Sequence, residues 1–148
     1  MITETLIKLF RRDLNVLKQE INAYNIEENL WVSNETISNS AGNLALHLIG
    51  NLNHFIGATL GDSAYVRQRD LEFSLKDVTK EEMIIQIDDT IRVVESVLNH
   101  LTDADLQKEY KRRAFEDVMT TEYFLVHLSM HLAYHLGQIN YHRRLLDI

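Results

Sequence analysis

The stretch HLSMHLAYHLGQINYH, residues 127–142, contains four of the seven histidines of the chain. Its apolar residues recur at the spacing of one helix face, so the stretch predicts a helix with a buried side. His127, His131 and His135 follow one another at intervals of four residues, which places them near the same face of that helix. The stretch is therefore either a histidine-rich helix or part of a metal site, and the rest of the chain must decide.

Working outward, three further segments have the 3.6-residue period of amphipathic helices. Proline is absent and there are only five glycines, so little interrupts these patterns. We expect helices over Glu4 to Ala23, over Ser40 to Leu60, from a capping box at Thr79 and Glu82 to about His100, and from Thr120 or Thr121 to about Leu146. The connections between them are predicted over 24–38, 62–78 and 101–119, the last with short helical turns around 103–107.

No segment has a convincing strand pattern, so the sequence predicts an all-α protein, a four-helix bundle in a single domain over residues 1–148. Because a long connection can cross a bundle, the helices need not follow the simple up-down-up-down order.

The composition excludes several classes of protein. There is no cysteine, so disulfides and thiolate ligands are excluded, and any transition-metal site must use histidine with aspartate or glutamate. A net charge of -7 argues against a nucleic-acid-binding protein, which usually carries a basic surface. The N-terminus does not have the pattern of a signal peptide, and no apolar run approaches the ~18 residues of a membrane span. We therefore expect a soluble, cytoplasmic protein with no membrane partner.

The helical spacing limits which histidines can bind one ion together. Positions four apart on a helix differ by about 40° in direction and by ~6 Å along the axis. One adjacent pair can therefore share an ion, either His127 with His131 or His131 with His135. His142 lies too far along the helix to join them, so a third ligand must come from another helix.

The second predicted helix offers that third ligand. His47 and His54 are seven residues apart and share a face of this helix, among apolar neighbours. A lone histidine on such a face is more often a hydrogen-bonded core residue, and exposed surface positions are the alternative for His100, His127 and His142. Two ring nitrogens from the fourth helix and one from the second would form a three-histidine site with an open coordination position.

Three stretches of the chain resemble a known family. They are N-S-A-G-N-L-A-L-H-L-I-G-N-L (39–52), R-Q-R-D-L-E-F (67–73) and H-L-A-Y-H-L-G-Q-I-N-Y-H-R-R-L-L (131–146). Together they resemble the DinB-like superfamily, also called DinB/YfiT-like, and within it an uncharacterised bacterial branch. The resemblance implies a four-helix bundle whose helices follow an up-down-down-up order.

The resemblance also implies a divalent metal ion, nickel or zinc, held by three histidines. The ligand positions of the family fall on His47, His131 and His135. The same pattern places His127 beside the ligands rather than among them. Four residues are expected to orient the imidazoles or to line a pocket: His127, Asn51, Tyr134 and Gln138. Ordinary hydrogen bonding on or between helices is the alternative for the last three.

The resemblance also implies an activity. It indicates a transferase that uses a low-molecular-weight thiol, such as bacillithiol, mycothiol or glutathione, as cosubstrate. The alternatives are a hydrolase that uses metal-bound hydroxide and a non-catalytic metal or small-ligand binding protein. We expect a small-molecule substrate and a homodimer. The chain departs from the family at Leu136, where many members carry a basic residue. Arg67, Arg69 and Arg143 are the candidates to replace it, although each is more commonly a solvated or ion-paired surface residue.

Overall fold

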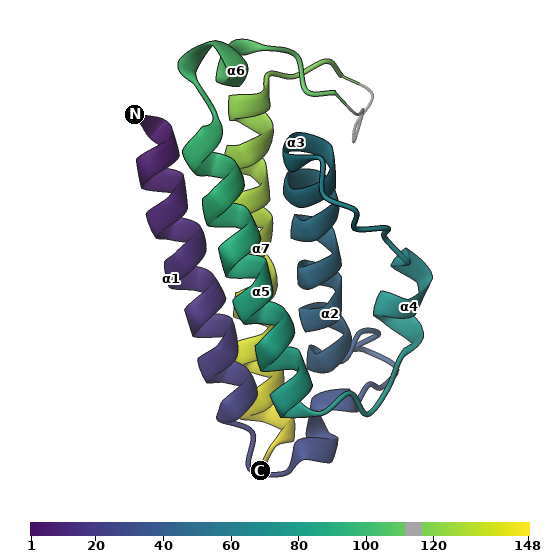
Figure 1. Cartoon of the computed structure of the whole chain (residues 1–148). Coiled ribbons are helices and arrows are strands. Elements are labelled where there is room, and N and C mark those ends of the chain that lie inside the picture. Colours follow the sequence, from purple (N-terminus) through teal and green to yellow (C-terminus); the bar gives the residue numbers. More distant parts are fainter. Residues whose placement is uncertain (112–116) are drawn as a thin grey trace.

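Four long helices lie side by side along the molecule (Figure 1). The computed structural model describes residues 1–111 and 117–148. The long helices are α1 (Ile2–Asn22), α2 (Ala41–Leu52), α5 (Lys80–His100) and α7 (Thr121–Leu146). Helices α1 and α7 run in one direction and α2 and α5 in the other (Figure 1). The predicted all-α bundle with its up-down-down-up order is confirmed, and the described residues contain no strand.

Packing follows from this order of the helices. Helix α1 contacts α5 and α7, and α2 contacts the same two helices from the other side. Because α2 and α7 are neighbours that run in opposite directions, side chains near the middle of α2 face side chains near the middle of α7 (Figure 1).

Hydroxyl side chains set the starts of the helices. Ser40 Oγ accepts a hydrogen bond from the backbone N–H of Asn43 at 3.2 Å, and Thr79 accepts one from Glu82 at 3.1 Å. Thr120 caps α7 in the same way. A side-chain oxygen at this position satisfies one of the first N–H groups of the helix, which have no partner within it. The predicted starts at Ser40, Thr79 and Thr120 are therefore confirmed.

Several short elements differ from the prediction. The segment predicted as one helix from Ser40 to Leu60 consists of α2, a π-helical segment η2 (Asn53–Ala58) and α3 (Thr59–Gly61). The predicted loop and connections contain a 3₁₀ turn η1 (Glu27–Trp31), a short helix α4 (Arg69–Ser74) and, as expected, α6 (Asp103–Gln107). Residues 112–116 of the predicted connection lie outside the described residues. Helix α4 is too short to show a hydrophobic period and, unlike α6, has no side-chain cap at its start, which explains why it was missed.

The connection that contains α4 runs along the outer side of α2, from the end of α3 at one end of the bundle to the start of α5 at the other (Figure 1). It places α4 against α2, where the side-chain N–H groups of Asn43 donate to the backbone oxygens of Glu72 at 2.9 Å and Leu75 at 2.8 Å. Helix α2 is thus covered on its outer side as well, and all 12 of its residues are buried. Polar side chains on α2 must therefore find partners inside the protein.

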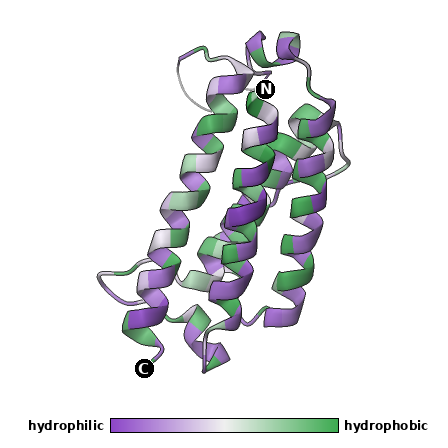
Figure 2. Cartoon of the chain, turned by 90° about the vertical axis from the view of Figure 1, so that its left-hand side faces the viewer, coloured by the Kyte–Doolittle hydropathy of each residue, from purple (hydrophilic) through white to green (hydrophobic). Residues whose placement is uncertain are grey.

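The apolar stripe predicted on the first helix faces the bundle interior. Five of its members are at most 2% exposed, namely Leu6, Phe10, Leu14, Leu17 and Ile21, while Leu9 lies at the edge of the buried face. Hydrophobic and hydrophilic residues alternate along the helices in Figure 2, as expected where one face of each helix is buried. Within the described part of the chain, no helix is long and apolar enough to cross a membrane.

The only tryptophan packs against the beginning of α2. A Cβ added to Gly42 would lie 2.6 Å from Cε3 and Cζ3 of the Trp31 ring, closer than any real contact allows. Glycine at this position therefore lets the indole of Trp31 lie directly on the helix backbone.

Candidate metal centre

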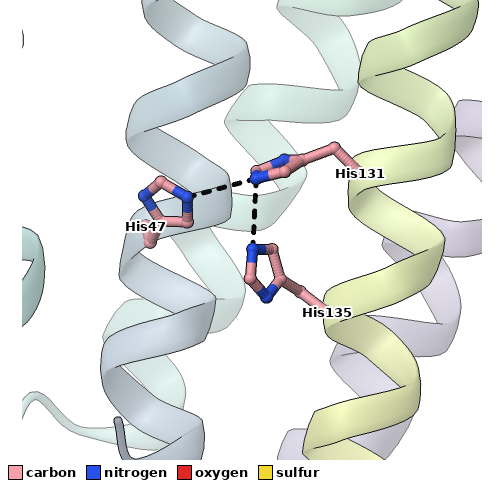
Figure 3. Close-up of side chains that lie close together, drawn as sticks. All are labelled: His47, His131 and His135. Carbon is pink, nitrogen blue, oxygen red and sulfur yellow. Dashed lines mark hydrogen bonds between the residues drawn. The ribbon is translucent and has the colours of Figure 1, made fainter. Parts of the chain in front are cut away.

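Three histidines from two helices meet in the middle of the bundle (Figure 3). His47 comes from α2, and His131 and His135 come from consecutive turns of α7. Nε2 of His131 lies 3.3 Å from Nε2 of His47 and 3.1 Å from Nε2 of His135. One nitrogen from each residue lies within 4.8 Å of the other two, so the group could hold a metal ion.

The geometry selects among the pairs that the sequence left open. On α7 it is His131 and His135 that approach each other, and on α2 it is His47 rather than His54 that faces them. The ring of His127 stacks beside that of His131 with 6.4 Å between the centroids, outside the group of converging nitrogens. His127 is thus a neighbour of the cluster.

Hydrogen bonds on the far side of two rings fix which nitrogen carries the proton. Nδ1 of His47 lies 3.0 Å from Oε1 of Glu72, and a carboxylate only accepts, so this nitrogen donates. Nδ1 of His135 likewise donates to Oε1 of Gln138 at 2.7 Å. Both residues therefore present the lone pair of Nε2 to Nε2 of His131. A ligating histidine commonly donates its other N–H to a carboxylate or carbonyl oxygen in this way.

The arrangement fits a metal ion on two counts. In a tetrahedral zinc site with Zn–N bonds of about 2.0–2.1 Å, two ligand nitrogens lie roughly 3.3 Å apart. The distances from His131 to His47 and to His135, 3.3 Å and 3.1 Å, are close to that edge length. A cation between the three nitrogens would also satisfy lone pairs that otherwise point at one another. The donor set of three imidazoles suits zinc or nickel.

The environment keeps the imidazoles of His131 and His135 neutral. Burial, and then the nearby rings of His135 and His47, lower the pKa of His131 to about 4. Burial also lowers the pKa of His135, although its hydrogen bond to Gln138 opposes the shift. Only a neutral imidazole can bind a metal, so both residues are ready to act as ligands at neutral pH.

Glu72 is a site residue that the sequence did not single out. Its carboxylate is 6% exposed, and Arg67 binds both of its oxygens, with Nε at 2.9 Å from Oε2 and Nη2 at 3.0 Å from Oε1. Burial alone would raise the pKa of Glu72, but the hydrogen bonds from His47 and Arg67 outweigh it, and the pKa lies below its usual value. The quoted motif R-Q-R-D-L-E-F contained both residues, but only side-chain contacts between distant segments could reveal their role.

Two of the other expected residues contact the histidine cluster. Gln138 holds His135, as described, and the ring of Tyr134 meets that of His135 edge-on with 5.4 Å between centroids. The side chain of Tyr134 is largely exposed. Asn51 is buried one turn after His47, and its Oδ1 has no hydrogen-bond partner in the described part of the chain. The same is true of Nδ1 of His131.

The candidate arginines are engaged in local contacts. Arg67 pairs with Glu72, and Arg143 pairs with Glu20 at 2.8 Å. Arg69 lies over the ring of Phe73 at 5.2 Å from its centroid. Arg67 and Arg143 are therefore ion-paired residues, which was the alternative to their replacing the basic residue that many family members carry.

Two of the remaining histidines, His142 and His100, lie outside the cluster. The exposed surface position that was the alternative for His142 does not describe it, because this residue is only 4% exposed. Its Nε2 donates to the backbone oxygen of Val32 at 2.8 Å, and its Nδ1 accepts from the hydroxyl of Tyr24 at 2.7 Å. His142 is a hydrogen-bonded core residue, buried because the chain before α2 folds over the end of α7. His100 is exposed at the end of α5, where Nδ1 contacts the backbone oxygen of Ser96.

A cavity of about 470 Å³ borders His135 and Gln138. Tyr134 and Tyr141 line it together with the loop at residues 36–39, and none of its lining residues is Asp, Glu, Lys or Arg. Its volume is in the range of small-molecule pockets. The cluster thus has a cavity of suitable size for a small ligand beside one of its histidines.

Fold and site together define an all-α bundle protein with three histidines arranged as a candidate divalent-metal centre. The family described as "Protein of unknown function (DUF1572)" matches residues 2–147, and the chain belongs to that family. None of the curated proteins matches the chain.

Proposed function

We propose that this protein binds one divalent metal ion, nickel or zinc, through His47, His131 and His135. The observation that carries the proposal is the convergence of three Nε2 atoms, two of which have their lone pairs turned inward by partners on the far side of the ring. We also propose that the DUF1572 family is a branch of the DinB-like superfamily. The quoted motifs and the up-down-down-up order of the helices support this placement.

The proposed activity is that of a transferase that uses a low-molecular-weight thiol. Three neutral imidazoles would leave the charge of a divalent ion uncompensated, and such an ion favours the deprotonated form of a bound thiol. In the transfer, the thiol loses its proton, its sulfur forms a bond to an electrophilic carbon, and the leaving group takes the electrons of the bond that breaks. This assignment is supported by the resemblance and by the neutral state of His131.

The residues of the chain have separate tasks in this proposal. Gln138 keeps the lone pair of His135 directed at the ion through the hydrogen bond to Nδ1. The cavity next to His135 would receive the small-molecule substrate, with the exposed tyrosines Tyr134 and Tyr141 at its edge. Burial on α2 and the cover provided by α4 shield His47 from solvent.

The test combines metal analysis with ligand binding. Protein purified without an affinity tag and loaded with nickel or zinc is expected to hold about one ion per chain. Glutathione, mycothiol and bacillithiol are then compared with their S-methyl derivatives in a thermal-shift assay, with metal-loaded and chelator-treated protein side by side. We expect stabilisation only by a free thiol and only in the metal-loaded protein.

Three results would overturn the proposal in whole or in part. If the purified, metal-loaded protein holds no stoichiometric metal, the proposed metal centre is refuted. Equal stabilisation by a thiol and by its S-methyl derivative would show that the protein does not recognise a free thiol as cosubstrate. Hydrolysis of an ester or amide in the absence of thiol would identify the protein as a hydrolase instead.

A further inference from the structure

The carboxylate of Glu72 is one of the two partners that turn an imidazole lone pair inward, but the proposed function assigns no task to the residues around this buried acid. We propose that Glu72 is a positioning residue that fixes the tautomer and ring orientation of His47. In this proposal Arg67 holds the carboxylate of Glu72 in place, and Gly50 leaves the space that the carboxylate occupies. The inference rests on the proposed function in one respect, namely that His47 is a metal ligand. It assigns a purpose to the motif R-Q-R-D-L-E-F at residues 67–73.

The first step concerns the shared oxygen. Oε1 of Glu72 accepts from Nδ1 of His47 at 3.0 Å and from Nη2 of Arg67 at 3.0 Å, so two donors meet at one atom. Nη2 of Arg67 also lies 3.4 Å from Nδ1 of His47. Both of these atoms carry protons when Glu72 is ionised, so this approach is not a hydrogen bond. The carboxylate alone therefore determines that Nδ1 of His47 is protonated and that Nε2 is free to bind an ion.

The second step concerns the cost of burying the acid. A buried carboxylate is unfavourable unless it is paired and hydrogen-bonded. Arg67 meets this need with two nitrogens on two oxygens, and such a bidentate fork also fixes the plane of the carboxylate. The guanidinium lies 5.6 Å from the centroid of the Phe55 ring, which restrains it from the other side. Arg67 thus orients Glu72, and Glu72 orients His47.

The third step concerns space on α2. A Cβ added to Gly50 would lie 1.9 Å from Oε2 and 2.6 Å from Cδ of Glu72. Any other residue at this position would push the carboxylate away from His47, which lies one turn earlier on the same face of the helix. The glycine in the sequence His-Leu-Ile-Gly is thus explained by the contact between α2 and α4.

The fourth step gives the expected magnitude. Removing an outer partner of a metal-binding histidine typically weakens metal affinity by about 10–100-fold. We therefore expect Glu72→Ala to weaken nickel or zinc binding by that factor. Glu72→Gln keeps an oxygen that can accept from His47 but loses the ionic pair with Arg67, so its affinity should fall between those of wild type and Glu72→Ala.

The first experiment measures the dissociation constant for Zn²⁺ or Ni²⁺ by competition with a chelator. Glu20→Ala is the matched control, because Glu20 forms a partly buried pair with Arg143 away from the cluster, and this variant should bind metal as wild type does. Circular dichroism confirms that each variant is folded. Unchanged affinity in Glu72→Ala, or an equal loss in Glu20→Ala, would overturn the inference.

The second experiment tests the space at Gly50 by a double-mutant cycle. Gly50→Ala should weaken metal binding in the wild-type background, because the new methyl displaces the carboxylate. In the Glu72→Ala background the same substitution has no carboxylate to displace and should cause no further loss. An equal loss in both backgrounds would mean that Gly50 acts on the fold rather than through Glu72.

The third experiment needs no metal. In metal-free protein, the ring nitrogens of His47 are assigned by ¹⁵N NMR, and we expect a protonated Nδ1 in wild type and in Glu20→Ala. In Glu72→Ala the proton should move to Nε2 or distribute between the two nitrogens. An unchanged tautomer would overturn this inference whatever the metal result, whereas failure of wild type to bind metal would overturn the proposed function.

Discussion

Nε2 of His131 lies 3.1 Å from Nε2 of His135, one turn further along α7. Two neutral imidazoles can be this close only if one donates a proton to the other or if both bind the same cation. Nδ1 of His131 has no partner in the described part of the chain under either solution, so it does not separate them. His47 and His135 each turn a lone pair toward Nε2 of His131, and that nitrogen has only one proton to donate. With His47 at 3.3 Å on the other side, a shared cation explains all three rings.

The first prediction concerns these ligands. His47→Ala, His131→Ala and His135→Ala are each expected to lose most bound metal, because two imidazoles alone hold a divalent ion weakly. His127→Ala is the matched control on α7 and should keep the metal, since its ring lies outside the converging nitrogens. Elemental analysis of each purified variant measures the outcome. If His127→Ala empties the site and His135→Ala does not, the ligand pair is one helical turn away from the pair proposed.

Much of the bundle could be predicted because its signals are local. The period of α1 places Leu6, Phe10 and Leu14 in the core, and the hydroxyl of Ser40 marks the start of α2. A periodic pattern and a helix cap act within a few residues, so one sequence suffices to find them. The order of the helices and the choice of His47 followed from the resemblance instead.

The parts that were missed depend on contacts between distant segments. His142 is buried by Tyr24 and Val32, which are more than 100 residues away in the chain. Glu72 reaches His47 because Asn43 holds the end of α4 by two hydrogen bonds to the backbone. Neither relationship leaves a periodic or local signal in the sequence.

The second prediction separates a core histidine from the proposed ligands. His142→Phe keeps a ring of similar size but removes the acceptor for Tyr24 and the donor for Val32, both of which would be left unpaired. The hydroxyl of Tyr24 must keep its proton, because burial raises the pKa of Tyr24. We expect a loss of about 2–4 kcal/mol in the free energy of unfolding. Urea denaturation measures this loss.

The metal content of His142→Phe should stay at the wild-type level, in contrast to its stability. His100→Ala is the control for replacing a histidine at an exposed site, and it should change the free energy of unfolding by less than about 0.5 kcal/mol. Loss of metal from folded His142→Phe would contradict the assignment of His142 to the core.

The third prediction concerns the expected homodimer. Five large apolar residues on α7 are 58–66% exposed and follow one another at intervals of 7, 4, 7 and 4 residues, which keeps them near one face of the helix: Tyr123, Met130, Tyr134, Tyr141 and Leu145. A second copy of the same helix could cover this face about a two-fold axis. We expect a dimeric mass by light scattering at micromolar concentration, and a monomeric mass for the double variant Met130→Glu, Tyr141→Glu.

The control for that experiment replaces an equally exposed apolar residue on another helix. Ile85 on α5 is 61% exposed, and Ile85→Glu should leave the dimer intact. A monomeric wild-type protein would refute the prediction, and dissociation by Ile85→Glu alone would move the interface to α5.

The fourth prediction is that the metal-free protein loses stability as the pH falls from about 6.5 to about 4. Burial lowers the pKa of His131 to about 4, whereas the ordinary value, which applies in the unfolded chain, is 6.5. Between these values the unfolded chain binds a proton that the folded protein does not, so the free energy of unfolding decreases as the pH falls. One such group contributes a slope of up to about 1.4 kcal/mol per pH unit, and His135, whose pKa is also lowered, adds to it.

The slope from these two histidines falls to half of its maximum at about pH 6.5 and disappears well above it, where both states of the chain leave the rings neutral. Urea unfolding in the presence of a chelator between pH 4.5 and 7.5 tests the prediction, and His131→Gln, which cannot titrate, should flatten the curve. Bound metal competes with protons for the same nitrogens, so in metal-loaded protein the loss should begin at a lower pH. An identical slope in wild type and His131→Gln would show that other groups unfold the protein in acid.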